Sequence, residues 1–363
     1  MADTYIFAGG GTGGHLYPGL AVAEELLKLR PDANMVFACS ARSIDQRILG
    51  GLPYAVVPQP ILPLPRSLRG WRGFLAAYVH SQRLARRLIL DLKPKSVLGL
   101  GGFAAAAVVK QAARRGIPTG LLNPDAVPGK ANRFLSRRTD VIFTQFESTA
   151  ECFAPRIRGR VKAVGCPIRS SLLAGDRDCA LRDLGLRNDR RTLLVNGGSL
   201  GAESINTALA DLVELLGARG GDWQVLHISG PQKALHDDVW RGRAIHVVQM
   251  EYCARMDQAY ACADLAVGRG GASSIAELSA MGVPSIILPY PHHADRQQYL
   301  NAQALERSGG AIVVEDAACG AAKELAKVLP GLLDNPDRLA QMRKSAIACA
   351  KPFAARAVAE WMA

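Results

Sequence analysis

Four glycine-rich turns are the segments of this sequence best suited to chemistry. Residues 9–14, 99–102, 197–201 and 268–271 each hold at least three glycines, follow a short apolar run and precede a segment of helical composition. A glycine backbone can approach a ligand closely, and the N–H groups that begin the following helix attract an anion. Tight packing of a strand against a helix would explain any one of these turns, but four of them favour an anionic ligand.

The first turn also fits the fingerprint of dinucleotide-binding proteins, because Gly9, Gly11 and Gly14 satisfy G-x-G-x-x-G. That fingerprint requires an acidic residue at the end of the second strand, where it binds the ribose hydroxyls. Here the second strand ends at residues 39–42 without an acid. Arg42 could bind a 2′-phosphate instead, so a dinucleotide-dependent oxidoreductase remains an alternative. No G-K-[ST] motif is present, which excludes a P-loop.

The elements that carry these turns alternate regularly along the chain. Short apolar runs alternate with longer helical segments, which predicts parallel βαβ units. The predicted strands cover residues 4–8, 35–39, 96–100, 119–122, 141–145, 192–196, 224–228, 246–248, 265–267, 285–288 and 311–314. Residues 164–191 show no strand pattern and divide the series in two. We therefore predict an α/β protein with two Rossmann-like, doubly wound domains, whose glycine turns line a cleft between them.

Length and composition limit the class of protein. The 363 residues, 49% of them hydrophobic and 21% charged, predict two globular domains and exclude a disordered chain. The longest apolar run, residues 97–109, is too short to span a membrane, and no signal peptide is recognisable, so we expect the protein in the cytoplasm. The eight cysteines include no C-x-x-C pair, which predicts reduced thiols and no metal site.

The positive charge lies in the first half of the chain. Residues 1–165 hold 23 Lys and Arg against 10 Asp and Glu, whereas residues 166–363 hold 21 against 22. Nucleic acid is not the expected partner, because no nucleic-acid-binding motif is present and only 6% of residues are aromatic.

The segment 61–90 concentrates this charge, with six arginines, no acids and several large apolar residues. It predicts peripheral contact with an anionic membrane surface. The alternative for its later part is a solvated arginine-rich helix over the core leucines Leu84, Leu88 and Leu92.

Four blocks of sequence together resemble one bacterial family. They are GGGTGGHLYPGLAVAEEL from residue 9, GGF from residue 101, GGSLGAESIN from residue 197 and GRGGASSIAELSAMGVPSIILPYPHHADRQQYLNA from residue 268. Their order and spacing resemble the peptidoglycan N-acetylglucosaminyltransferases of glycosyltransferase family 28, over residues 5–315. The last block is the most specific.

The resemblance implies a GT-B fold with an acceptor- and membrane-facing domain over residues 1–165 and a UDP-sugar-binding domain over residues 166–342. The helix within residues 343–363 is expected to pack back on the first domain. The implied reaction transfers GlcNAc from UDP-GlcNAc to the 4-hydroxyl of MurNAc-pentapeptide on a polyprenyl pyrophosphate, with inversion. It implies no cofactor and no essential metal. The D-x-D pattern at residues 176–178, which metal-dependent glycosyltransferases use, lies in the linker and is interpreted as solvated surface.

The resemblance assigns eight residues of the second domain to the donor: Ser199, Arg269, Ala272, Ser273, Ser274, Glu277, Gln297 and Gln298. Backbone donors at residues 272–274, with Arg269 and Ser199, are expected to stabilise the diphosphate leaving group. Glu277 is expected to accept hydrogen bonds from both ribose hydroxyls. The two glutamines are expected to contact the sugar, although residues 295–298 also suit the start of a helix.

The other implied site residues are Thr12, Gly13, Gly14, His15 and Asp125 in the first domain and Arg169 near the hinge between the domains. His15 is a candidate general base, because imidazole titrates near neutral pH. It could instead bind a pyrophosphate or cap the helix that begins near Pro18. Arg169 resembles an arginine close to a phosphate.

The chain departs from the family on the acceptor side. Residues 122–125 read Leu-Asn-Pro-Asp where the family commonly has His-Glu-x-Asn, Cys166 replaces an asparagine and Leu200 replaces a glutamine. Asp125 is therefore a second candidate base. Another lipid glycosyltransferase of the same fold with a different acceptor remains an alternative, as does a catalytically silent lipid-binding homologue.

Overall fold

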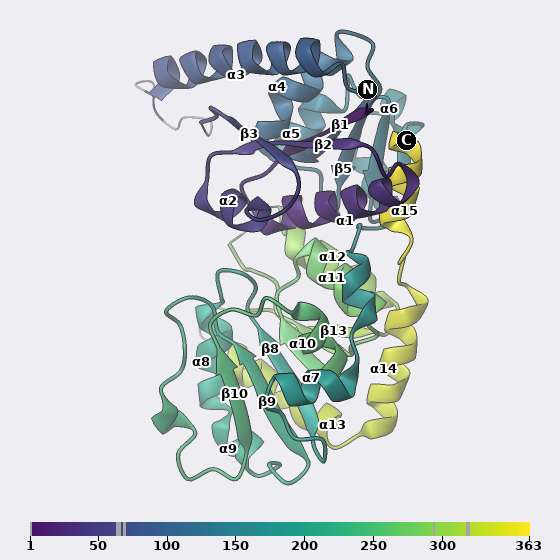
Figure 1. Ribbon diagram of the computed structural model, residues 1–363. Coiled ribbons are helices and arrows are strands. Elements are labelled where there is room, and N and C mark those ends of the chain that lie inside the picture. The colour runs from purple at the N-terminus through teal and green to yellow at the C-terminus, as the bar shows by residue number, and fades with distance from the viewer. Residues whose placement is uncertain (1, 63–66, 68–69, 293–294, 317–319) are drawn as a thin grey trace. The chain divides into compact units, whose positions relative to one another are not determined.

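The computed structural model describes residues 2–62, 67, 70–292, 295–316 and 320–363 (Figure 1). The chain forms two compact units. Unit 1 holds residues 1–169 and 351–363, and unit 2 holds residues 170–350. The first crossing between the units thus falls at 169/170, where we expected 165/166, and the second at 350/351, where we expected 342/343.

Unit 1 is built on a seven-stranded parallel sheet with the order β3-β2-β1-β4-β5-β6-β7. Its strands are β1 (Thr4–Gly9), β2 (Asn34–Ser40), β3 (Ala55–Gln59), β4 (Ser96–Gly101), β5 (Thr119–Asn123), β6 (Val141–Thr144) and β7 (Val161–Ala163). Its helices are α1 (Gly13–Leu29), α2 (Ser43–Leu49), α3 (Trp71–Leu92), α4 (Gly102–Ala113), α5 (Lys130–Leu135), α6 (Pro155–Arg158) and α15 (Ala354–Met362).

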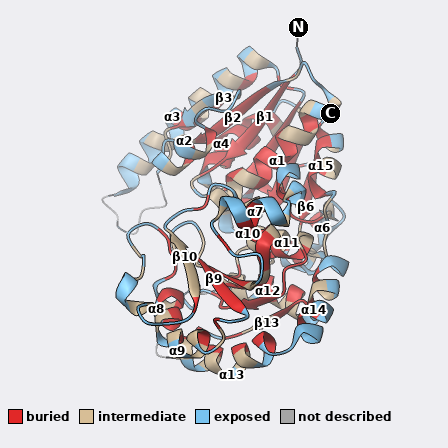
Figure 2. Ribbon diagram, turned by 60° about the horizontal axis from the view of Figure 1, so that its bottom comes forward, coloured by how far each residue is buried: buried red, intermediate tan, exposed pale blue. Residues whose placement is uncertain are grey.

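Alternate residues of β1 enter two separate cores, as the two-residue period of a strand requires. Tyr5 and Phe7 pack with residues of α1 and α15, whereas Ile6 and Ala8 pack with residues of α3 and α4. The sheet is therefore covered on both faces, and β1 and β2 are buried throughout most of their length (Figure 2).

The last helix of the chain, α15, belongs to the first of these cores. The ring of Trp361 lies 5.6 Å from that of Phe143, and the hydroxyl of Ser96 donates to the carbonyl of Met362 at 3.0 Å. The preceding helix, α14 (Pro336–Ala348), lies in unit 2.

Unit 2 repeats the architecture with a six-stranded parallel sheet of order β10-β9-β8-β11-β12-β13. Its strands are β8 (Arg191–Asn196), β9 (Trp223–Ile228), β10 (His246–Met250), β11 (Ala263–Gly268), β12 (Ser285–Ile287) and β13 (Ala311–Val313). Its other helices are α7 (Arg177–Asp183), α8 (Glu203–Asp211), α9 (Val213–Gly217), α10 (Met256–Cys262), α11 (Ala272–Ala280), α12 (Gln297–Arg307) and α13 (Ala321–Leu333).

The predicted fold class, two doubly wound parallel sheets, is confirmed. All predicted strands form, and the sequence reading missed only β3 and β7 among the described strands. Both missed strands are sheet edges: β3 is largely exposed and contains Pro58, and β7 has three residues. Neither has the buried apolar run by which a central strand is recognised.

Candidate functional site

The four glycine turns occur in pairs at equivalent places in the two sheets. In unit 1 they follow the adjacent strands β1 and β4, and in unit 2 they follow the adjacent strands β8 and β11. At each of these places the strand order reverses direction, which is where open α/β sheets bind ligands. Each unit therefore offers its own candidate site at the carboxyl ends of its central strands.

The first turn of unit 1 accepts only glycine at two positions. Gly9 and Gly10 have φ values of +150° and +156°. A Cβ on Gly9 would lie 2.8 Å from the carbonyl oxygen of Gly101, and one on Gly10 would lie 2.3 Å from Oδ2 of Asp45. The turn is thus packed against both the second turn and a buried carboxylate.

That carboxylate, Asp45 in α2, was not singled out from the sequence. Asp45 is fully buried and accepts the Gly11 N–H at 2.7 and 2.9 Å, the Ser40 N–H at 2.9 Å and the Ser40 hydroxyl at 2.6 Å. Burial, with a smaller contribution from the Asp45 charge, raises the pKa of the Cys39 thiol to about 11. Arg42 donates to the carbonyl of Gly11 at 3.3 Å. Asp45 and Arg42, which follow β2, therefore bind the glycine turn itself. This use of the two side chains disfavours a dinucleotide-dependent oxidoreductase.

His15 lies in the first turn of α1, half-buried between the two glycine turns. Its Nδ1 lies 3.2 Å from Thr12 Oγ1 and 3.3 Å from the Gly10 carbonyl oxygen. Its ring faces Gly101, where a Cβ would lie 3.0 Å from the ring. Since a carbonyl only accepts, the Gly10 contact favours the tautomer protonated at Nδ1, which leaves the lone pair of a base on Nε2.

The residues around His15 are less enclosed. Thr12 is the N-cap residue of α1 and is exposed, Gly13 is half-buried, and Gly14 is exposed. Pro18 has no N–H to donate to the Gly14 carbonyl, so the helix gives that oxygen no partner from this position.

The turn after β5 is fixed by two buried asparagines. Asn123 donates to the Asp125 carbonyl at 2.7 Å and accepts from Asn132 at 3.0 Å. Asn132 also donates to the Leu122 carbonyl at 3.2 Å, while its buried Oδ1 has no hydrogen-bond partner among the described residues. Asn123 thus shapes the backbone at half-buried Asp125. Asn132, which the sequence analysis did not name, lies near Gly101 and offers an unused acceptor.

Arg169, the last residue of the first segment of unit 1, lies with its guanidinium 4.9 Å from the centre of the Tyr17 ring. Tyr17 is on α1, two residues after His15. Arg169 therefore lies beside the helix that carries the candidate base.

In unit 2, helix α11 begins directly after the turn at residues 268–271. Its N-cap residue, Gly271, provides no side-chain cap, and its first turn holds no acid. The hydroxyl of Ser273 is buried without a hydrogen-bond partner in the part of the chain that the structure describes. A helix start of this kind suits an anion, because its N–H dipoles are not countered by a carboxylate. Ala272, Ser273 and Ser274 form this first turn.

Arg269 is engaged within unit 2. Its guanidinium donates to Asp316 at 2.5 Å, to the Leu288 carbonyl at 2.9 Å and to the Ser204 hydroxyl at 2.9 Å. The Ser204 hydroxyl in turn donates to Asp316 at 2.7 Å. The arginine and the acid are 12% and 2% exposed. This network ties the glycine turn to the ends of neighbouring elements, and its acid and serine were missed from the sequence.

The other expected donor-side residues lie in the loop after β8, at the start of α12 and on α11. Ser199 is exposed in a loop whose Leu200 carbonyl accepts Lys233 Nζ at 3.0 Å. Gln297 and Gln298 begin α12, and Gln298 Oε1 accepts the Tyr290 N–H at 2.9 Å. Glu277 is half-buried on α11 and accepts the Tyr260 hydroxyl at 3.0 Å.

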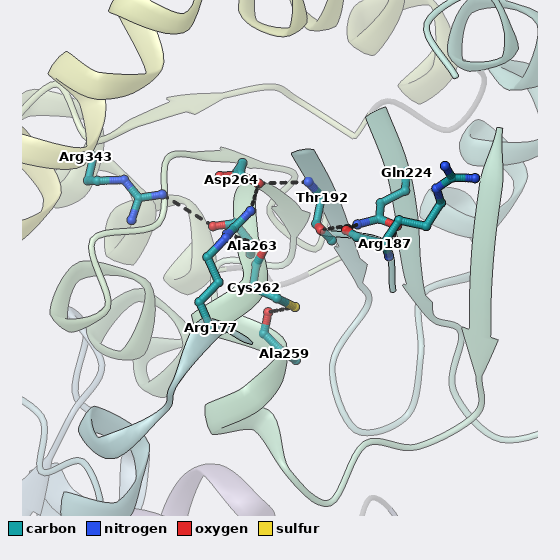
Figure 3. A network of polar contacts seen from close by, with 9 residues as sticks. All are labelled: Arg177, Arg187, Thr192, Gln224, Ala259, Cys262, Ala263, Asp264 and Arg343. Carbon is teal, nitrogen blue, oxygen red and sulfur yellow. Dashed lines mark hydrogen bonds and ion pairs between the residues drawn. The ribbon is translucent and has the colours of Figure 1, made fainter. Parts of the chain in front are cut away.

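The D-x-D segment has a structural explanation. Asp176 is the N-cap of α7 and accepts the Cys179 N–H at 2.7 Å. Arg177 donates to Asp264 at 2.8 Å, and Asp264 also accepts the Thr192 N–H, so α7 is tied to the beginnings of β8 and β11 (Figure 3). These contacts lie at the amino-terminal ends of the strands, whereas the glycine turns follow their carboxyl ends. Among the described residues, no cluster of His, Cys, Asp and Glu could hold a metal ion.

Helix α3 covers residues 71–90 of the basic segment 61–90. Trp71, Leu75 and Val79, four residues apart, are 41%, 53% and 46% exposed. The C-terminal half of the helix buries Ser81, Ala85 and Ile89. The arginines at 72, 83, 86 and 87 are exposed, whereas Leu64, Arg66, Leu68 and Arg69 lie outside the described residues. No helix within the described ranges is both long and apolar enough to cross a bilayer.

Two Rossmann-like units, each with glycine turns at its switch point, form the GT-B fold of glycosyltransferases. The chain belongs to glycosyltransferase family 28, because residues 5–144 match the N-terminal domain of that family and residues 192–359 match its C-terminal domain.

Named relatives align with nearly the whole chain. A protein of Desulfitobacterium hafniense strain Y51 named UDP-N-acetylglucosamine–N-acetylmuramyl-(pentapeptide) pyrophosphoryl-undecaprenol N-acetylglucosamine transferase is 36% identical, over 96% of this chain and 95% of its own length. A Clavibacter michiganensis protein of the same name is 37% identical, over 94% of this chain and 91% of its own. The crystal structure of Acinetobacter baumannii MurG shares the fold with a TM-score of 0.77 at 22% identity, covering 99% of both chains.

Proposed function

We propose that this protein transfers GlcNAc from UDP-GlcNAc to the 4-hydroxyl of MurNAc-pentapeptide on undecaprenyl pyrophosphate, a step of peptidoglycan synthesis. The observation that carries this proposal is the 36% identity, over 96% of the chain, to an enzyme named for that reaction. The acceptor oxygen forms the new bond at the anomeric carbon with inversion. UDP leaves with the electron pair of the broken bond, and the acceptor proton passes to a base of the enzyme.

In this proposal unit 2, expected from the sequence as the UDP-sugar domain, binds the donor. The first turn of α11 binds the diphosphate. This assignment is supported by the uncapped start of the helix and by the Ser273 hydroxyl, which has no hydrogen-bond partner among the described residues. Glu277 accepts hydrogen bonds from the ribose hydroxyls, and the hydroxyl of Ser199 donates one to the diphosphate. Gln297 and Gln298 bind the sugar. Arg269 contributes chiefly by holding the turn, since its charge is paired with Asp316.

Unit 1 binds the acceptor, and His15 removes the proton of its hydroxyl through Nε2. The support is the contact between Nδ1 and the Gly10 carbonyl, which selects the required tautomer. Arg169 and the turns at residues 12–14 and 101–102 bind the pyrophosphate of the acceptor. Asp125 is the second candidate for the base.

The polyprenyl acceptor requires that the enzyme work at a membrane surface. We propose that the segment 61–90 makes this contact on the cytoplasmic side, through the exposed apolar row of α3 and its arginines. Each basic residue near an anionic leaflet contributes about 1 kcal/mol, so four or more hold the protein reversibly.

Release of UDP from UDP-GlcNAc, with and without a short-chain lipid I analogue, tests the proposed reaction. We expect release that depends on the analogue, with GlcNAc appearing on it. UDP-GlcNAc and UDP should also raise the melting temperature, whereas NAD(P) should not. No turnover with the analogue despite binding of UDP-GlcNAc would refute the acceptor and leave the donor assignment standing.

A lipid glycosyltransferase with another acceptor is the second candidate. One observation favours it. Asn123, which replaces the family's glutamate, donates a hydrogen bond to the Asp125 carbonyl and accepts one from Asn132, so its amide is used within unit 1. Analogues that lack the peptide or carry another sugar separate the two candidates, because only the second predicts faster turnover with one of them.

A further inference from the structure

A tyrosine in the core of unit 2 points its hydroxyl at the proposed ribose site. Tyr260, on α10, is 4% exposed and lies between the fully buried Ala259 and Cys262. A phenol hydroxyl in such a place is costly unless it is hydrogen-bonded. It donates to Oε2 of Glu277 at 3.0 Å. No part of the reaction derived above uses this phenol.

The phenol of Tyr260 is the donor in its contact with Glu277. Ser274 acts to lower the pKa of Tyr260. Burial and the charge of Glu277 nevertheless raise the pKa of Tyr260 well above its ordinary value, so the phenol stays protonated and donates to the carboxylate.

The contact restricts a side chain that otherwise has considerable freedom. Glu277 is half-buried, and fixing a glutamate rotamer costs up to about 2 kcal/mol. A rigid, buried phenol bound to Oε2 fixes the plane of the carboxylate before the ligand arrives. With its plane fixed, the carboxylate presents its oxygens to the ligand in one orientation, and a carboxylate can accept several hydrogen bonds at once.

We propose that Tyr260 is a positioning residue that orients the Glu277 carboxylate for the two ribose hydroxyls of the nucleotide and so sets the preference for ribose over 2′-deoxyribose. This inference rests on the proposed function, in which Glu277 binds the ribose. It adds a specificity-determining residue that does not itself touch the ligand.

Tyr260→Phe tests the inference, since it removes one oxygen and keeps the ring in the core. Calorimetry measures the affinity of wild-type protein and variant for UDP and for 2′-deoxy-UDP. We expect the variant to bind UDP about 5–10-fold more weakly and 2′-deoxy-UDP at most about twofold more weakly, as for loss of one hydrogen bond to a charged acceptor. KM for UDP-GlcNAc should rise with little change in kcat.

Tyr54→Phe is the matched control, because it removes a half-buried phenol hydroxyl in unit 1 and should alter neither affinity. Equal weakening of both ligands by Tyr260→Phe, or no weakening, overturns the positioning role. If the wild-type protein bound UDP and 2′-deoxy-UDP equally well, Glu277 would not be the residue that binds the ribose hydroxyls. That result refutes the proposed nucleotide site, and the inference with it, before any variant is made.

Discussion

The carboxylate of Asp45 holds the backbone N–H of Gly11, with its two oxygens at 2.7 and 2.9 Å from the nitrogen. The same group accepts two hydrogen bonds from Ser40 at the end of β2. A buried anion thereby joins the ends of β1 and β2. The carbonyl oxygen of Gly10, the residue before Gly11, lies 3.3 Å from His15 Nδ1. The position of the candidate base therefore depends on the Asp45 carboxylate.

Asp45→Asn should therefore loosen the first glycine turn. The amide presents N–H groups where donors now point, and the charge that strengthens four hydrogen bonds is lost. We expect the opening free energy of residues 4–29, measured by hydrogen exchange, to fall by about 2–3 kcal/mol, with a matching loss of turnover. Asp32→Asn, at an exposed acid of the same unit, is the control and should change neither. Unchanged exchange in Asp45→Asn would contradict the role of the carboxylate.

His15→Ala should lower kcat by about 10²–10⁴-fold while UDP still binds unit 2 with unchanged affinity. The reason is that Nε2 carries the free lone pair when the Gly10 carbonyl fixes the proton on Nδ1. Rates of UDP release across pH 5.5–9 measure the effect, and the limb due to the base should disappear in the variant. Asp125→Asn is the competing variant. If it abolished turnover and His15→Ala did not, the base would be Asp125.

Reversing the charge of three exposed arginines on α3, at positions 72, 83 and 86, should release the protein from anionic vesicles. At about 1 kcal/mol for each basic residue, the partition coefficient falls by about 100-fold or more. Sedimentation with phosphatidylglycerol vesicles at two salt concentrations measures it. A variant with Glu at the exposed positions 323, 338 and 344 of unit 2 has the same net charge and should still bind. Equal loss in both variants would show a nonspecific effect of charge.

The central strands and glycine turns could be predicted because each has a recognisable pattern within a short stretch of consecutive residues. Apolar runs ending in glycine identify β1, β4, β8 and β11 directly. Edge strand β3 could not be found in this way, since its residues are mostly exposed and its partner alone defines it. A seven-strand sheet was therefore read as five strands.

The supporting side chains could not be predicted because their partners are far away in sequence. Asp45 lies 34 residues from Gly11, and Asp316 lies 47 residues from Arg269. A local pattern marks Arg269 as a free positive charge, and only the fold shows that a buried acid neutralises it. Local sequence patterns thus point to candidate ligand-binding residues, but not to the distant side chains that hold those residues in place.

His227 of β9 should make unit 2 sensitive to acid. It is fully buried, with Nδ1 at 2.8 Å from Gln249 Oε1 and Nε2 at 3.0 Å from Asn206 Oδ1, and burial lowers its pKa from 6.5. Below pH 6.5 the unfolded chain binds a proton that the folded histidine does not. The free energy of unfolding therefore falls as the pH drops from 6.5 toward the lowered folded pKa.

Hydrogen exchange of peptides from β8 and β9 at pH 7.5, 6.5 and 5.5 measures this dependence, after correction for the intrinsic exchange rates. His227→Gln removes the titrating group, so it should lower stability at pH 7.5 and flatten its dependence on pH. His236→Gln, at an exposed histidine of the same unit, should keep the wild-type slope. An acid-dependent loss that persists fully in His227→Gln would assign the effect to other groups. The sign is informative in itself, because a histidine held as a cation in the folded unit would make stability rise on acidification.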